Sequence, residues 1–145
     1  MKKSHRSLCG IALGALIASA VSLPAQTNAA QVARGKYVVE SVGLCGDCHT
    51  AHNERGEPDR ARWLQGAPLD FQPIHPIPMW TSVALPIAGL PAGWTDADMI
   101  KFLQTGIRRD GTPPRPPMPA YRLNQADAGA VTAYLKSLRP PGRTP

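Results

Sequence analysis

The sequence predicts an all-α fold in which three to four main helices are joined by long, proline-rich loops. Apolar residues recur at the spacing of a helix face in three segments, 31–42, 95–106 and 124–138. No other stretch alternates apolar and polar residues over the length of a strand, which counts against a β-sheet. The chain contains 16 prolines, and none falls within these three segments. Because proline interrupts helices, the prolines mark the loops.

Residues 1–30 have the pattern of a secretory signal peptide. An apolar run over residues 8–23 precedes a zone of small residues, where cleavage after Ala29 or Ala30 fits best, with residues 18–20 as an earlier alternative. The run has 16 residues, short of the ~20 that a membrane-spanning helix needs, so an uncleaved anchor is the weaker interpretation. The basic residues that open the signal are Lys2, Lys3 and Arg6.

Removal of the signal leaves residues 31–145 as a single domain. It also lowers the formal net charge of +6 by three, because the signal has three basic residues and no acidic ones. The remaining charge is too small to indicate nucleic-acid binding. Export predicts a periplasmic protein, either soluble or bound to a membrane complex, with direct membrane contact only if the signal is retained.

The first predicted helix, residues 31–42, leads into the motif Cys-Gly-Asp-Cys-His at residues 45–49. Cys-x-x-Cys-His is the pattern of covalent haem attachment. Residues three apart lie on the same side of a helical turn, so the thiols of Cys45 and Cys48 can reach the two vinyl groups of one porphyrin. His49 then offers a neutral imidazole nitrogen as the proximal iron ligand.

Two other uses of paired cysteines fit less well. A disulfide or thioredoxin-like redox pair does not need the histidine and usually lies beside a βαβ pattern, which this sequence lacks. A zinc site needs a second pair of ligands, and none follows at the required spacing. Since Cys9 belongs to the signal, Cys45 and Cys48 are the only cysteines of the exported domain. The sequence therefore predicts one covalent haem c.

Residues 50–93 contain seven prolines and show neither helical nor strand periodicity. A loop of this length is unusual in a compact domain unless it has a function. A porphyrin supplies a flat apolar surface for such a loop, and the alternative of a disordered linker fits poorly with its aromatic residues. The candidate haem-wall residues of this loop are Trp63, Leu64, Leu69, Phe71, Ile74, Ile77 and Trp80.

Two further helices are recognised by their ends. Thr95 is an N-cap, Asp96 and Asp98 suit the positive end of a helix, and Gly106 is a C-terminal stop. Asn124 caps the last helix, which ends before a pair of prolines. The apolar faces comprise Met99, Ile100, Phe102, Leu103 and Ile107 in one helix and Ala126, Val131, Tyr134, Leu135 and Leu138 in the other.

A haem bound only by its proximal histidine has an open sixth position. His52 is one turn from that histidine and cannot cross the ring, and Met99 lies on an apolar helix face, where core packing is the commoner role. Met79 and His75, in the long loop, remain open as ligands. Met118 is favoured, because the prolines on both sides restrict its backbone and hold the weak thioether ligand in place.

The order of these features resembles that of class I c-type cytochromes over residues 33–138. The resemblance is closest to small monohaem members and to single domains of the cytochrome c subunits of periplasmic dehydrogenases. It implies the small cytochrome c fold wrapped around one haem, with iron ligated by His49 and Met118. It also implies that the first and last helices cross near Gly35, Tyr37 and Tyr134. Candidate haem-wall residues are then Tyr37, Trp63, Trp80 and Tyr121.

Two features depart from this family pattern. Members often have a Gly-Pro soon after the motif, whose carbonyl orients the proximal histidine. Here only residues 56–58 and 66–68 approximate it. Many members also carry an asparagine where this chain has residues 80–82. The partners of the proximal histidine and of the haem propionates therefore do not follow from the resemblance.

Ligation by histidine and methionine predicts a one-electron carrier rather than an enzyme, because both axial positions are filled. Its redox partners would be a dehydrogenase, a quinol-oxidising complex or a terminal oxidase, and it would act free or as a subunit of a dehydrogenase complex. The alternative is a haem enzyme or gas-binding protein with an open or labile sixth site.

Acid-acetone extraction tests the covalent attachment. Because thioether bonds survive where coordination bonds do not, we expect the haem to stay on the polypeptide. Replacing both Cys45 and Cys48 by Ala should release it. Extractable haem in the unmutated protein would end this interpretation.

Overall fold

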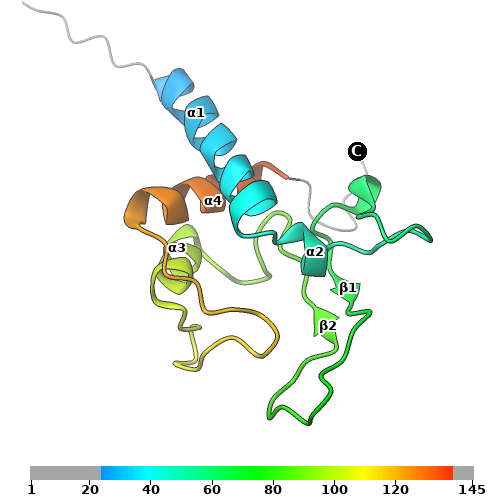
Figure 1. Cartoon of the computed structure of the whole chain (residues 1–145). Coiled ribbons are helices and arrows are strands. Elements are labelled where there is room, and N and C mark those ends of the chain that lie inside the picture. Colours follow the sequence, from blue (N-terminus) through cyan, green and yellow to red (C-terminus); the bar gives the residue numbers. More distant parts are fainter. Residues whose placement is uncertain (1–23, 139–145) are drawn as a thin grey trace, which may run out of the picture.

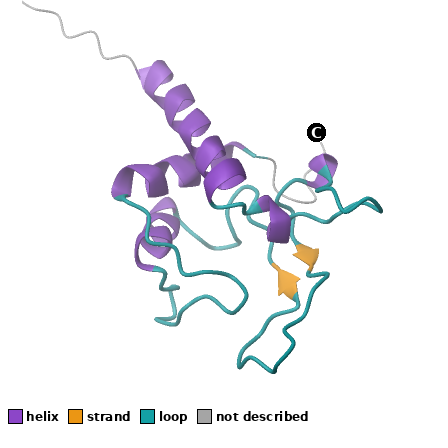
Figure 2. Ribbon diagram, viewed as in Figure 1, coloured by secondary structure: helices purple, strands orange, loops and turns teal. Residues whose placement is uncertain are grey.

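The computed structural model describes residues 24–138; residues 1–23 of the predicted signal and residues 139–145 lie outside this range. Helices and long loops make up almost all of the described chain (Figure 2), so the all-α prediction is confirmed. The helices are α1 (Pro24–Tyr37), the π-helical turn η1 (Val38–Val42), α2 (Gly46–His49), the 3₁₀ turn η2 (Arg60–Arg62), α3 (Asp96–Thr105) and α4 (Gln125–Ser137). None of these described helices has the length and apolar character that crossing a bilayer requires.

The prediction that strands are absent is wrong in one place. β1 (Ala67–Pro68) and β2 (Val83–Ala84) pair antiparallel. Two residues per strand are too few to show alternation, so the sequence carries no signal for them. Their pairing closes the loop over residues 69–82, which projects from the body of the molecule (Figure 1). It also brings residues 84–88 beside residues 64–67.

The first helix differs from its prediction at both ends. α1 begins at Pro24 instead of residue 31, so it covers the expected cleavage sites after Ala29 and Ala30. Its predicted last turn is π-helical, and the N–H of Gly43 donates to the carbonyl of Val38 at 2.7 Å. This wider turn precedes Leu44, which has a left-handed φ of 49°. The chain changes direction here and enters α2. Signal function and cleavage stay predictions.

α1 crosses α4 at close range (Figure 1), and Gly35 permits this approach. A Cβ atom at position 35 would overlap the carbonyl oxygen of Ala130 and lie 2.8 Å from Cβ of Tyr134. Arg34 joins the same two helices through an ion pair of 2.7 Å with Asp127 in the first turn of α4. Of the crossing predicted near Gly35, Tyr37 and Tyr134, the contact between Gly35 and Tyr134 is confirmed, whereas Tyr37 is 53% exposed.

α3 and α4 begin as their caps predict. Thr95 and Asp98 form a reciprocal capping box, and the side chain of Asn124 accepts from the N–H of Asp127 at 2.8 Å. Gly106 ends α3 with a φ of 63°. The core between η1, α3 and α4 consists of Val38, Val39, Leu64, Ala88, Met99, Phe102, Leu103, Ala128, Val131, Tyr134 and Leu135. This frame leaves α2 and the long loops to form the site.

Two glycine substitutions test the crossing of α1 and α4. Gly35→Ala forces a methyl group into the Ala130 carbonyl, so we expect the free energy of unfolding to fall by about 1–3 kcal/mol. Gly129→Ala is the matched control within α4, because its Cβ would meet only the end of the flexible Gln31 side chain at 3.4 Å. Helix propensity should then raise stability by about 0.5–1 kcal/mol. Urea unfolding measures both, and equal effects would refute a tight crossing at position 35.

Candidate functional site

The predicted attachment motif lies in the short helix α2 and the residue before it. The N–H of His49 donates to the carbonyl of Cys45 at 2.9 Å, which closes one helical turn over the motif. The cysteines are three apart on that turn and therefore lie on one side of it. Both thiols are free and partly exposed. This arrangement leaves both sulfurs available for bonds to one flat group.

The imidazole of His49 is buried, with 9% of the residue exposed, and its Nδ1 lies 2.7 Å from the carbonyl oxygen of Leu85. A carbonyl oxygen only accepts, so Nδ1 must carry the proton and Nε2 keeps its lone pair. Burial lowers the pKa of His49, and the hydrogen bond to Leu85 opposes that shift in part. The ring is therefore a neutral imidazole with one fixed tautomer, which is the form that binds a metal ion.

The carbonyl that orients His49 is not one of those suggested by the sequence. Gly56 and Glu57 are exposed, and Pro58 pairs with His52 in an isolated β-bridge. In the second segment, the N–H of Gly66 donates to the backbone carbonyl of His49 at 2.8 Å. The acceptor for the ring is Leu85, which precedes Pro86 and follows β2 directly. A Leu-Pro pair within a long loop is a weak signal. The pairing of β1 with β2 and the hydrogen bonds of Ile87 and Ala88 to Leu64 bring it to the histidine.

The indole of Trp63 packs against α2. A Cβ atom at Gly46 would overlap the ring of Trp63, so the indole lies directly on the backbone of the motif. Its Nε1–H donates to the hydroxyl of Tyr134 at 3.1 Å, and that hydroxyl donates to Glu40 at 2.8 Å. The guanidinium of Arg60 lies over the ring, 4.0 Å from its centroid. Trp63 thus links the α1–α4 crossing to the attachment turn.

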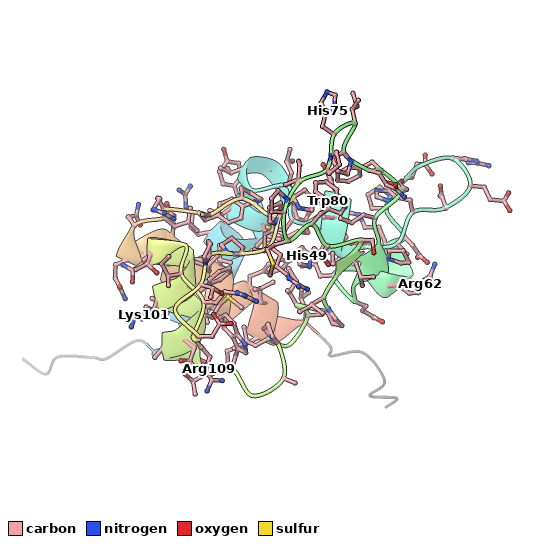
Figure 3. The ribbon with its side chains drawn as sticks, turned by 90° about the horizontal axis from the view of Figure 1, so that it is seen from below. His49, Arg62, His75, Trp80, Lys101 and Arg109 are labelled. Carbon is pink, nitrogen blue, oxygen red and sulfur yellow. The ribbon has the colours of Figure 1, made fainter. Side chains whose placement is uncertain are left out.

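Trp80 offers a hydrogen-bond donor that has no acceptor in the protein. Its Nε1 is the one buried side-chain nitrogen or oxygen without a partner among residues 24–138. The indole packs edge-on against Phe71, with ring centroids 5.8 Å apart. In Figure 3 it lies between His49 and the loop tip that carries His75. An unpaired buried N–H is unfavourable, and a haem propionate is an acceptor that would satisfy it. This residue therefore fits the predicted cofactor.

Met118 lies in an arch over residues 114–123 that is fastened at three points. The carbonyl of Pro116 accepts from the N–H of Thr81 at 2.9 Å, which ties the arch to the loop beside Trp80. Tyr121 donates its hydroxyl to the carbonyl of Gly43 at 2.6 Å, just before the attachment motif. The N–H of Leu123 donates to Leu103 in α3. Met118 is partly buried against the core within this arch.

The other candidate ligands lie in different surroundings. Met99 belongs to α3 and lies in the protein core, with 4% exposed, whereas Met79 is 62% exposed. His75 is exposed at the tip of the projecting loop and points away from His49 (Figure 3). His52 lies 3.8 Å from the carboxylate of Asp70. Met118 is the candidate that combines partial burial with a fastened backbone.

The remaining predicted haem-wall residues differ widely in how far they are exposed. Tyr121 lies beside Cys45, and burial is the main cause that raises the pKa of its hydroxyl. Tyr37 is 53% exposed on α1, with the guanidinium of Arg34 over its ring. Leu64 is fully buried in the protein core, and Ile74 is 94% exposed. A haem-wall role for Tyr37, Trp63, Trp80 and Tyr121 stays a prediction.

Comparison with known proteins identifies related sequences. A family model described as cytochrome c matches residues 32–139. The chain is 33% identical over 108 residues to a diheme cytochrome c-type protein of Cereibacter sphaeroides, covering 71% of this chain and 34% of that protein. It is 29% identical over 113 residues to the cytochrome subunit of fructose dehydrogenase of Gluconobacter japonicus, covering 72% and 21%.

A third relative is the cytochrome c subunit of a quinone alcohol dehydrogenase of Gluconacetobacter polyoxogenes. It is 31% identical over 126 residues, covering 81% of this chain and 26% of the relative. The chain thus spans between 21% and 34% of the length of these three proteins.

Tyr134→Phe tests the contact between the helix crossing and the attachment turn. It leaves the Trp63 N–H without an acceptor, so we expect the free energy of unfolding to fall by about 1–3 kcal/mol. Burial and the bond to Glu40 raise the pKa of Tyr134 to about 12, from about 10 in an unfolded chain.

The folded state therefore favours the neutral phenol, and this stabilisation is complete below pH ~10 and lost as the pH rises towards 12. The stability difference between the two proteins should shrink over that range in urea titrations. Tyr37→Phe, at an exposed position, is the control and should change stability little. A constant difference up to the highest pH would contradict the assigned network.

Proposed function

Because this chain belongs to the cytochrome c family, we propose that it is a periplasmic one-electron carrier whose haem c is ligated by His49 and Met118. Electron transfer by covalently bound haem c follows from the family. The axial ligands, the single haem, the compartment and the redox partners are the proposed parts. When bound, the haem supplies an Fe(II)/Fe(III) couple that takes up and releases one electron.

The observation that carries the proposal is the hydrogen bond from His49 Nδ1 to the carbonyl of Leu85 at 2.7 Å. It fixes the tautomer that leaves Nε2 free for iron, directly after the two cysteines of the motif. Metal-ligating histidines usually donate their other N–H to a carbonyl or carboxylate in this way. Cys45 and Cys48 would form the thioether bonds, and Trp80 would donate its unpaired N–H to a propionate.

Met118 is the proposed sixth ligand. Its arch is tied to Thr81 on one side and to Gly43 on the other, which restricts where the sulfur can lie. A weak thioether ligand benefits from this restriction, because little conformational entropy is lost when it binds. If His49 and Met118 both bind the iron, no coordination site would be left for a substrate, which favours a carrier over a haem enzyme or gas-binding protein.

The relatives suggest the kind of redox partner. Two of them are named as cytochrome subunits of dehydrogenases, one for fructose and one for alcohol. We infer a partner of the dehydrogenase kind, with electrons passed on to a quinol-oxidising complex or a terminal oxidase. One relative is named diheme, but Cys45 and Cys48 form the one Cys-x-x-Cys-His motif of this sequence. One haem is therefore expected for residues 31–145, after the proposed signal.

Met118→Ala tests the ligand set. We expect the covalent haem and the His49 bond to persist while the sixth position is vacated. The oxidised protein should lose the weak far-red band of an iron–sulfur bond, its reduction potential should fall, and the reduced haem should bind carbon monoxide readily. Spectroscopic redox titration and carbon monoxide mixing measure these changes.

Met79→Ala is the matched control, because this methionine is exposed and its substitution should change none of the three readouts. If the band survives in Met118→Ala, another residue is the ligand. Rapid carbon monoxide binding by the unmutated protein would favour the alternative of an open or labile sixth site.

A further inference from the structure

The carbonyl that accepts the hydrogen bond from His49 Nδ1–H lies in a segment with little regular structure. Leu85 directly follows the two-residue strand β2, and its side chain is 66% exposed. Neither a helix nor burial of that side chain holds the carbonyl 2.7 Å from Nδ1. The Leu85 carbonyl must therefore be held in place by the hydrogen bonds of the residues that follow it.

Leu64 supplies that support through its backbone carbonyl. This oxygen accepts two hydrogen bonds, from the N–H of Ile87 at 2.9 Å and from the N–H of Ala88 at 3.0 Å. Both donors follow Leu85 closely in the chain. Their attachment to one oxygen fixes the segment after Leu85 relative to residue 64.

The conformation of Leu64 is itself held from outside. Its φ of 58° is in the left-handed region, which is unfavourable for leucine. Its side chain is fully buried. Such a conformation persists only where the surroundings over-determine it, and it marks candidate functional positions. The N–H of Leu64 donates to the hydroxyl oxygen of Thr50 at 3.0 Å. This contact holds the backbone of residue 64 in place.

Thr50 directly follows His49 and is fully buried. The contacts therefore form a closed circuit: Thr50 holds Leu64, Leu64 holds the segment after Leu85, and Leu85 holds the ring of His49. A second bond runs parallel to it, from the N–H of Gly66 to the backbone carbonyl of His49 at 2.8 Å. The ring and its acceptor are thus positioned by one small unit.

We propose that Thr50 is a positioning residue that sets the strength of the His49–Leu85 hydrogen bond and, through it, the reduction potential. This inference rests on the proposed function, in which His49 is an iron ligand. A hydrogen bond from Nδ1–H makes the imidazole a stronger electron donor and stabilises Fe(III) relative to Fe(II). Weakening that bond therefore raises the potential.

Thr50→Val tests the proposal in the haem-loaded protein. Valine has nearly the same shape as threonine but cannot accept the Leu64 N–H. We expect a higher reduction potential and exchange of the His49 Nδ1 proton with deuterium that is faster by roughly tenfold, the factor for losing one net hydrogen bond. Thr50→Ser restores the hydroxyl and should return both readouts towards those of the unmutated protein.

Thr132→Val is the matched control. Thr132 is also buried, at 2% exposed, but its hydroxyl donates to Ala128 within α4, away from the circuit. This variant should lose stability without changing the potential. An unchanged potential in Thr50→Val, or an equal shift in Thr132→Val, would overturn the proposal. Failure of the proposed function has a different signature, since the unmutated protein would then lack covalent haem or an iron–histidine bond.

A measurement on the unmutated protein applies even if Thr50→Val does not fold. If one unit positions the ring, the amide protons of Leu64, Ile87 and Ala88 exchange through the same opening as the Nδ1 proton of His49. Their protection factors should then agree within roughly tenfold. Much faster exchange at Leu64 than at His49 would show that the ring is held independently, and the proposal would fail.

Discussion

The site depends most on the hydrogen bond of 2.7 Å between His49 Nδ1 and the carbonyl of Leu85. It decides which imidazole nitrogen keeps its lone pair, and it fixes the ring relative to the two cysteines of the same turn. Burial alone would also keep His49 neutral, but it would not choose the tautomer. The small β1–β2 pair and the bonds to Leu64 bring the acceptor from 36 residues away in the sequence. These hydrogen bonds fix the positions of residues 64–67 and 84–88 relative to His49.

The helical frame and the site are joined by few but specific contacts. Gly35 allows α1 to approach α4, and Tyr134 extends from that crossing to the indole of Trp63. Trp63 in turn lies on Gly46 within the attachment turn. Two residues before Cys45, the carbonyl of Gly43 accepts a hydrogen bond from the Tyr121 hydroxyl. The attachment turn is thus held between the two contacts, so the long loops need little regular structure of their own.

The hydrogen bonds around His49 belong to a single segment, whereas the relatives of this chain are longer than the part that it matches. The chain spans between 21% and 34% of the length of three relatives, each of which therefore contains further sequence beyond a matching unit. The hydrogen bonds that connect His49 with Thr50, Leu64, Gly66 and Leu85 all fall within residues 49–88. Within the described residues, the imidazole of His49 is therefore oriented by hydrogen bonds from this one segment.

The sequence by itself determined the elements whose signals are local: the Cys-x-x-Cys-His motif, the caps at Thr95 and Asn124, and the stop at Gly106. Each depends on residues within one turn, so residue type and spacing suffice. The acceptor for His49 was missed, because Leu85 is far away in the chain and any residue can present a backbone carbonyl. The packing of Trp63 on Gly46 and the hydrogen bonds of Ile87 and Ala88 to Leu64 could not be predicted for the same reason. Only the tertiary structure decided these contacts, since they arise from loop closure and backbone geometry and leave no pattern of side-chain types.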